Sequence, residues 1–147
     1  MTKTVEPIGK ILVPIDFSDC SINALNFAKR VAAGSDAALA LLYVDDDPIL
    51  MQPSTDQSFR DEHENKMAMK FVELLTTEER ERFKVEMAVR CGTASHEIEK
   101  YAAEKGIDLI VIGNIGRSKI SKVLLGSTTS HIVANAPCPV LTVKPSE

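Results

Sequence analysis

The chain has 147 residues, of which 44% are hydrophobic and 26% are charged, and its formal net charge is −4. This length and composition are typical of one globular domain with a hydrophobic core. The negative charge argues against a nucleic-acid-binding surface, and no apolar run approaches the roughly 20 residues that span a membrane. Residues 1–8 are expected to form a polar tail without a signal-peptide core, which favours a cytoplasmic protein.

Five apolar runs predict β-strands. Four of them are almost continuously apolar, the exception being the third, and this pattern is typical of parallel strands covered by helices on both faces. The predicted strands are Lys10–Ile15, Ala38–Val44, Val85–Arg90, Asp108–Ile112 and Val140–Lys144.

Helical patterns separate these strands, over Ser21–Ala33, Arg60–Leu75, Ala94–Lys105 and Ser127–Asn135. We expect the first helix to end near Gly34 and the third to end at Gly106 in a left-handed cap. The four residues from Thr76 to Glu79 have a capping-box pattern, which predicts a further helical turn. Residues 45–59 contain two prolines and little periodicity, so we expect an exposed, flexible connection there.

Strand and helix alternate along the whole chain. This order predicts a single α/β domain over residues 1–147, with one open, mostly parallel five-stranded sheet, helices on both faces and a Rossmann-like arrangement. Ligands of such sheets bind beyond the carboxyl ends of the strands, where the strand order reverses.

A glycine-rich segment lies between the fourth predicted strand and the fourth predicted helix. Gly113, Gly116 and Gly126 are separated by two and nine residues, and Ser127 follows the last of them. Glycines let backbone N–H groups approach a ligand closely, and the first turn of a helix attracts anions. Ser127 is also well placed to cap the helix through its hydroxyl group. The segment therefore predicts a phosphate or nucleotide site.

This segment resembles the nucleotide-binding signature of the universal stress protein family. The resemblance extends from Lys10 to Lys144, and is specific in the last third of the chain. It is carried by Gly113-x2-Gly116-x9-Gly126-Ser127, by Ala136-Pro137-Cys138-Pro139-Val140-Leu141 and by Ile11-Leu12-Val13-Pro14-Ile15-Asp16-Phe17-Ser18. Two departures are Phe17, where many members have glycine, and Ile115, which removes a polar group beside the ligand.

The resemblance implies the strand order 3-2-1-4-5, which places the ends of the first and fourth strands at one crevice. It implies that Asp16 accepts hydrogen bonds from a ribose or a base amine, and that Pro14 and Val44 form an apolar wall for adenine. The backbone near Ile112 is expected to contact the edge of the base. Ribose and phosphates would then be held by Gly113, Gly116, Gly126, Ser127 and Thr128.

Several of these residues have a structural interpretation as well. Asp16 is also typical of a turn or a helix cap, and Ser127 of a simple N-cap, a role compatible with phosphate binding. Arg117, in the nine-residue loop, either offsets phosphate charge or is a solvated cation. We interpret Asp45-Asp46-Asp47 as a solvated turn and His131 as a surface residue of a helix.

The chain carries no spacing that indicates a metal site. Its three histidines show no ligand spacing, and its three cysteines form no Cys-x-x-Cys pair, so we expect reduced thiols and no metal site formed by these side chains. A regulatory thiol at Cys20, near a helix start, is the alternative for one of them. Among cofactors we expect ATP or a related adenine nucleotide, with Mg²⁺ as its accompanying ion.

The leading hypothesis is an ATP-binding regulatory protein of the stress response, and the resemblance implies a homodimer formed through the edge strand Val140–Lys144. A slow ATPase using the same pocket and a ligand-free dimeric scaffold are the alternatives. Binding is favoured over catalysis because no Gly-x4-Gly-Lys-Ser/Thr loop and no clear general base are found. A phosphorelay receiver is disfavoured because the third strand ends in Arg90 and not in an aspartate.

Overall fold

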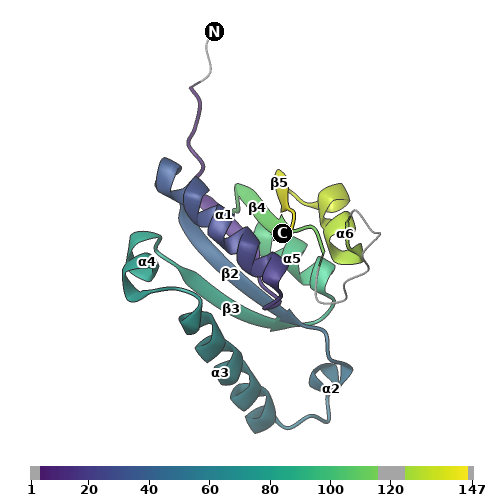
Figure 1. Cartoon of the computed structure of the whole chain (residues 1–147). Helices are drawn as coiled ribbons and strands as arrows, with labels where there is room; N and C mark the ends of the chain where they lie inside the picture. Colours follow the sequence, from purple (N-terminus) through teal and green to yellow (C-terminus); the bar gives the residue numbers. More distant parts are fainter. Residues whose placement is uncertain (1–3, 116–124, 146–147) are drawn as a thin grey trace.

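The computed structural model describes residues 4–115 and 125–145, which contain one five-stranded parallel sheet in the order β3-β2-β1-β4-β5. The strands are β1 (Lys10–Pro14), β2 (Ala38–Asp45), β3 (Glu86–Cys91), β4 (Leu109–Gly113) and β5 (Val140–Val143). Each lies within one residue of its predicted bounds at either end. The α/β class, the strand order and the helices on both faces are confirmed, and β3 and β5 form opposite edges of the sheet (Figure 1).

The central position of β1 follows from its composition. Ile11, Leu12 and Val13 are fully buried, since both faces of this strand are covered by helices. Leu12 pairs with Ala40 of β2 on one side and with Ile110 of β4 on the other. In this parallel register, the carboxyl ends of β1, β2 and β4 lie at the same edge of the sheet.

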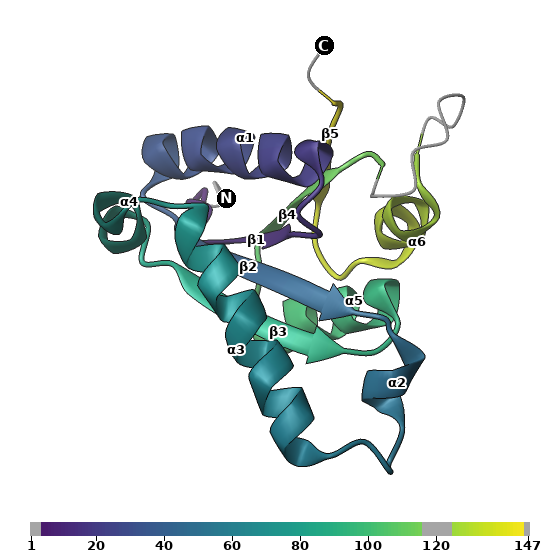
Figure 2. The ribbon, with the colours of Figure 1, turned by 60° about the horizontal axis from the view of Figure 1, so that its bottom comes forward.

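Six helices lie in the described residues: α1 (Asp19–Ser35), α2 (Pro48–Met51), α3 (Gln57–Glu73), α4 (Thr77–Arg82), α5 (Ala94–Glu104) and α6 (Ser127–Asn135). One hydrophobic cluster joins the sheet to α1 and α3, and a second joins its other face to α5 and α6. Figure 2 shows α1 and α5 on opposite sides of the sheet. Of the described helices, none is both long and apolar enough to cross a membrane.

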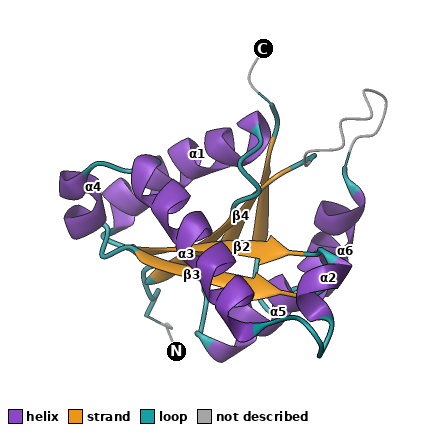
Figure 3. Ribbon diagram, turned by 90° about the horizontal axis from the view of Figure 1, so that it is seen from below, coloured by secondary structure: helices purple, strands orange, loops and turns teal. Residues whose placement is uncertain are grey.

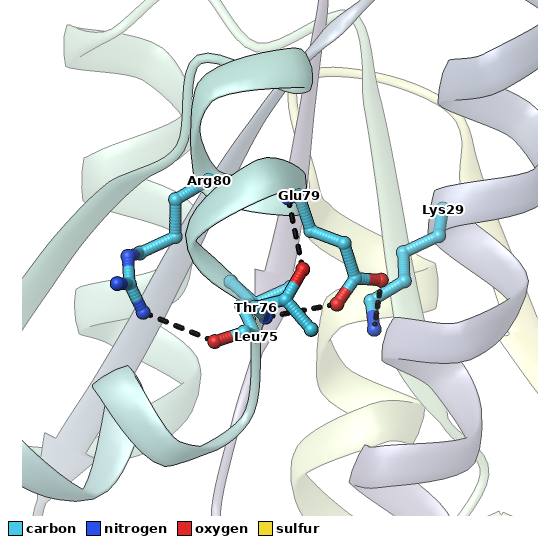
Figure 4. A network of polar contacts seen from close by, with 5 residues as sticks. All are labelled: Lys29, Leu75, Thr76, Glu79 and Arg80. Carbon is cyan, nitrogen blue, oxygen red and sulfur yellow. Dashed lines mark hydrogen bonds and ion pairs between the residues drawn. The ribbon is translucent and has the colours of Figure 1, made fainter.

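The predicted capping box before α4 is confirmed (Figure 4). The Thr76 hydroxyl accepts from the Glu79 N–H at 3.0 Å, while the Glu79 carboxylate accepts from the Thr76 N–H at 2.9 Å. Glu79 also pairs with Lys29 of α1 at 2.8 Å, and this contact lowers the pKa of the Glu79 carboxyl group. Arg80 donates to the Leu75 carbonyl at 3.0 Å. A local sequence motif thus joins α4 to α1.

The predicted end of α1 near Gly34 is confirmed to within one residue, whereas the predicted capping role of Ser127 at α6 was wrong. Helix α1 continues through Gly34 and is followed by Asp36 in the left-handed region, at φ 59°. Aspartate tolerates this conformation through its short polar side chain, so no glycine is needed. At α6 the N-cap is Gly126, and Ser127 is the first helical residue without a capping bond from its hydroxyl. The left-handed cap at Gly106 is confirmed, at φ 62°.

The connection over residues 45–59 holds more regular structure than the sequence predicts. Helix α2 lies within it because Asp47 accepts from the Ile49 N–H at 3.0 Å and Pro48 occupies the first helical position. Helix α3 begins at Gln57, three residues earlier than predicted, since the Asp56 carboxylate caps it. Asp45 also does not lie in a solvated turn, because it is buried at the end of β2.

Candidate functional site

The carboxyl ends of β1, β2 and β4 open onto a cavity of about 240 Å³, which we call the strand-end cavity. Figure 3 shows the arrowheads of β2 and β3 directed toward this end of the molecule, where α2 and α6 lie. The cavity is lined by Pro14, Ile15, Asp16, Ser21, Leu42, Val44, Asp46, Ala94, Ile98, Ile112, Gly113, Ile115, Gly126, Ser127, Thr128 and Thr129. Its position agrees with the place where open α/β sheets bind ligands.

Apolar side chains make up the inner wall of the cavity. Leu42 and Val44 project from the same face of β2, because strand side chains alternate with a period of two. Ile112 of β4 and Ile98 of α5 add to the wall, and Pro14 ends β1 beside them. A flat apolar ring such as a nucleobase suits this lining, since burial removes its faces from water.

Asp16 lies in the turn between β1 and α1 and lines the strand-end cavity. Its Oδ1 atom accepts from the Ser18 N–H at 2.9 Å and also from the Ser18 hydroxyl. Ser18 in turn caps α1 by accepting from the Ser21 N–H at 3.2 Å. The turn interpretation of Asp16 therefore holds in this structure, and it leaves the same side chain beside the cavity.

Gly113 ends β4 and packs against the first turn of α1. A Cβ atom at this position would lie 2.8 Å from the Cys20 Sγ and 3.1 Å from the Cys20 carbonyl carbon and oxygen. Real Cβ atoms do not approach so closely, so the glycine is required by helix–strand packing. The sequence interpretation, in which Gly113 makes room for a ligand, missed this requirement. Gly113 does line the cavity, and its contact with a ligand stays a prediction.

The N-terminus of α6 forms the polar side of the cavity. The Gly126 N–H bonds to the Asn114 carbonyl at 2.6 Å, and the Thr129 hydroxyl donates to the Gly113 carbonyl at 2.8 Å. These bonds fix α6 against the end of β4. The first turn of α6 carries no capping bond from a side chain of the described residues, so its N–H groups are available to an anion.

Helix α5 shares this property. Thr93 stands at its N-cap without a capping bond from its side chain, whereas side chains cap α1, α2, α3 and α4. Both uncapped helices begin at the carboxyl end of the sheet, and Ala94 of α5 and Thr128 of α6 line the same cavity. Two helix N-termini, each with a partial positive charge, therefore border this cavity.

A second, more open hollow of about 460 Å³ adjoins the strand-end cavity, and we call it the outer hollow. It shares Asp46, Ala94, Ser127 and Thr128 with the cavity, and it adds Met51, Gly92, Thr93, Ser95 and His131. His131 is exposed, as the sequence predicts, and its Nδ1 atom lies 2.7 Å from Glu99 Oε1. The described lining of the two spaces includes two carboxylates and no lysine or arginine.

The described part of the chain contains no candidate metal site, and the thiols of Cys20 and Cys91 differ in their surroundings. No group of three His, Cys, Asp or Glu side chains there has the geometry to hold a metal ion. Cys20 is buried, with its thiol 3.4 Å from both Asn114 Oδ1 and the Val143 carbonyl oxygen. Partial burial, together with nearby Asp45, raises the pKa of Cys91, which favours the neutral thiol over the nucleophilic thiolate.

The structure brings together eight of the ten predicted site residues. Pro14, Asp16, Val44, Ile112, Gly113, Gly126, Ser127 and Thr128 all line the strand-end cavity. Gly116 and Arg117 lie outside the described residues. The sequence interpretation did not include Leu42, Asp46 or Ile98. A signal for Leu42 was present, since it lies two residues before Val44 in a strand, but Ile98 depends on how α5 crosses the sheet.

Comparison with known proteins places this fold and site in context. Residues 7–144 match the family model described as the Universal stress protein family. The chain belongs to the universal stress protein family. It is 34% identical over 140 residues to universal stress protein MJ0531 of Methanocaldococcus jannaschii, and the aligned region covers 92% of this chain and 81% of that protein. The family assignment made from the glycine segment is thereby confirmed.

Solved structures of the family have the same fold. Universal stress protein UspA from Lactobacillus plantarum is 31% identical, with a TM-score of 0.79 over 95% of this chain and 99% of that chain. A universal stress protein solved in complex with cAMP is 24% identical, with a TM-score of 0.65 over 96% of this chain and 100% of that chain. At this identity the second likeness shows the fold alone.

Proposed function

We propose that this chain is an ATP-binding regulatory protein of the stress response, which acts in the cytoplasm as a homodimer. The strand-end cavity is the observation that carries the proposal, because it combines an apolar wall with the uncapped N-terminus of α6. Side chains of the described residues leave this cavity unfilled. A protein of the same fold was solved with cAMP, which supports an adenine nucleotide as the ligand class.

In the proposed complex the base lies against Pro14, Val44 and the backbone of Ile112, and Asp16 accepts from the ribose or the base. The phosphates lie at the first turn of α6, where they receive hydrogen bonds from main-chain N–H groups and from Ser127 and Thr128. Gly113 borders the ribose. We propose that Gly116 and Arg117 complete the phosphate site, as the family signature implies, and that Mg²⁺ accompanies the triphosphate.

Thermal unfolding in the presence of ATP tests the proposal. Ligand at 100 times its dissociation constant stabilises the folded state by about 2.7 kcal/mol. We expect such a shift with ATP, measured with and without Mg²⁺. No shift at millimolar concentrations of ATP, ADP, AMP and cAMP would support the ligand-free scaffold. Release of phosphate by the ATP-bound protein, followed in the same samples, separates the slow ATPase from simple binding.

Ser127→Asp is the most informative variant. Ser127 is the exposed first residue of α6, where a carboxylate interacts favourably with the helix dipole and should not lower the stability of the free protein. The same charge repels a bound phosphate, so we expect ATP affinity to fall. Ser130→Asp, one turn along the same helix at another exposed position, is the matched control. Equal ATP affinity in all three proteins would refute the phosphate site.

The proposed homodimer uses the edge strand β5. This strand pairs with β4 along one side, and Asn23 holds the residue after it by donating to the Lys144 carbonyl at 2.8 Å. An edge strand offers unpaired backbone groups to a second copy of the chain. Thr142 is exposed, and in a two-fold interface Thr142→Lys would bring two added charges together.

We therefore expect Thr142→Lys to yield monomers in sedimentation measurements. Val133→Lys, at an exposed position on α6, serves as the control and should leave the dimer intact. A wild-type protein that sediments as a monomer at every concentration would contradict the proposed dimer.

A further inference from the structure

Phe17 has an unusual backbone conformation beside the candidate site. Its φ is 62°, in the left-handed region that favours glycine, whereas Phe17 carries a bulky side chain. Of the other non-glycine residues with positive φ in the described chain, Asp36 follows α1 and Lys84 precedes β3, away from the cavity lining. A strained residue in a turn persists only where its surroundings hold it in place.

The surroundings of Phe17 are aromatic. The centre of its ring lies 5.4 Å from that of Tyr43 in β2 and 5.6 Å from that of Phe71 in α3, and both pairs are tilted. Lys70 places its ammonium group 5.2 Å from the centre of the same ring. Tyr43 and Phe71 are buried, so the ring of Phe17 is held by the core beneath α1 and α3.

The three residues of this turn have three different neighbours. Asp16 lines the strand-end cavity, Phe17 packs into the core on the other face of the sheet, and Ser18 caps α1. The Asp16 carboxylate accepts both Ser18 hydrogen bonds from within this turn. Its position at the cavity therefore depends on the left-handed conformation of Phe17.

We propose that Phe17 is a positioning residue for the nucleotide, which acts by fixing the Asp16 carboxylate at the cavity before the ligand arrives. This inference rests on the proposed function, because it assigns Asp16 a contact with the ligand. The aromatic contacts hold the turn in one conformation, so the free protein avoids the entropy cost of ordering the loop when it binds. A glycine at position 17 would adopt the same φ without strain, and would leave the turn free to move.

Phe17→Gly and Phe17→Tyr test the proposal together. Glycine removes both the ring and the steric constraint, and we expect it to weaken ATP binding by about tenfold. Tyrosine keeps the ring and should keep the affinity. Phe27→Ala is the matched control, because Phe27 is a half-buried aromatic residue of α1 that contacts Arg30 and does not line the cavity. Its ATP affinity should equal that of the wild type.

A double-mutant cycle with Asp16→Asn distinguishes positioning from general destabilisation. If Phe17 acts through Asp16, Phe17→Gly should cause no further loss of ATP affinity in the Asp16→Asn background. Independent losses that add in the double variant would overturn the inference. So would an unchanged affinity in Phe17→Gly, although the proposed function would then stand.

A measurement without ligand keeps the two proposals separable. In the free protein we expect Phe17→Gly to speed exchange of the Ser18 amide hydrogen, which donates to Asp16, while the buried strand amide of Leu12 stays protected. Unchanged protection at Ser18 would overturn the positioning role even if the wild type bound no nucleotide at all.

Discussion

Gly113→Ala tests the tight packing of β4 against α1 beside the strand-end cavity. The added Cβ would lie 2.8 Å from the Cys20 Sγ and 3.1 Å from the Cys20 backbone, all within the buried junction of β4 and α1. Overpacking of this kind costs about 1–3 kcal/mol. Alanine also restricts the unfolded chain, which offsets about 0.4–1 kcal/mol of that cost. We expect a net loss of about 1–2 kcal/mol in the free energy of unfolding.

The clash has two parts that a second substitution separates. Cys20→Ala removes the sulfur atom, and alone should cost about 1 kcal/mol for the lost buried surface. In the double variant the closest contact is gone, while the contacts to the Cys20 backbone remain. The double variant should therefore be more stable than the sum of the two single effects predicts, by about 1 kcal/mol.

Thermal and urea unfolding measure these differences. For a chain of 147 residues, 1 kcal/mol corresponds to about 3 °C in Tm. Gly34→Ala is the matched control, because no atom lies within 4 Å of its added Cβ and Gly34 is inside α1. It should be more stable than the wild type by about 0.5–1 kcal/mol. A Gly113→Ala protein as stable as the wild type would refute the packing argument, and substitutions of Gly113 could then be used to test ligand binding directly.

Three further predictions concern other contacts. Glu79→Gln keeps the capping box but loses the Lys29 ion pair. Because the pKa of Glu79 is lowered in the folded state, the ion pair stabilises the protein above pH 4.5, and this stabilisation is lost as the pH falls through the lowered pKa. The Tm difference between the variant and the wild type should therefore vanish at strongly acid pH. Thr129→Val leaves the Gly113 carbonyl without its buried hydroxyl donor, so the free energy of unfolding should fall by about 1–2 kcal/mol in urea titrations. An unchanged free energy of unfolding would contradict the hydrogen bond between Thr129 and Gly113. A thiol reagent should modify the exposed Cys91 first, and the rate should still rise above pH 9 because the pKa of Cys91 is raised. The reagent should reach the buried Cys20 only when the protein unfolds. Fast labelling of Cys20 in the folded protein would contradict the burial of this residue.

The strands could be predicted closely because their signal is local and redundant. Almost continuous apolar runs bounded by glycine, proline or polar residues mark four of the five, the exception being the edge strand β3. Burial on both faces of the sheet demands this composition in the central strands. The helices depend more on caps, and caps are single side chains. Asp47 and Asp56 begin α2 and α3, yet an aspartate near a proline is equally common in an irregular loop, so these starts could not be distinguished by pattern.

The candidate site shows a different limit. Residues that follow a strand directly, such as Asp16, could be placed at the crevice from the fold class alone. Ile98 could not be placed in this way, because it belongs to a helix whose crossing angle is fixed by packing with β2 and α6. Gly113 was found by its motif but for an incomplete reason, since nothing in the sequence shows that Cys20 lies against it.

The helix starts argue for a ligand more strongly than the glycine spacing does. Side chains cap four of the described helices: Ser18 caps α1, Asp47 caps α2, Asp56 caps α3 and Thr76 caps α4. Of these, α1 also begins at the strand-end cavity, which Ser21 lines. The two that begin without such caps, α5 and α6, both contribute to the lining of the strand-end cavity and the outer hollow. A cap is worth about 1 kcal/mol to a helix, and local rules are most often broken at functional sites. The absence of side-chain caps at both helices leaves backbone N–H groups that can bind a ligand. Ser127→Asp tests this at α6, because it places a carboxylate where the ligand's negative charge is proposed to lie.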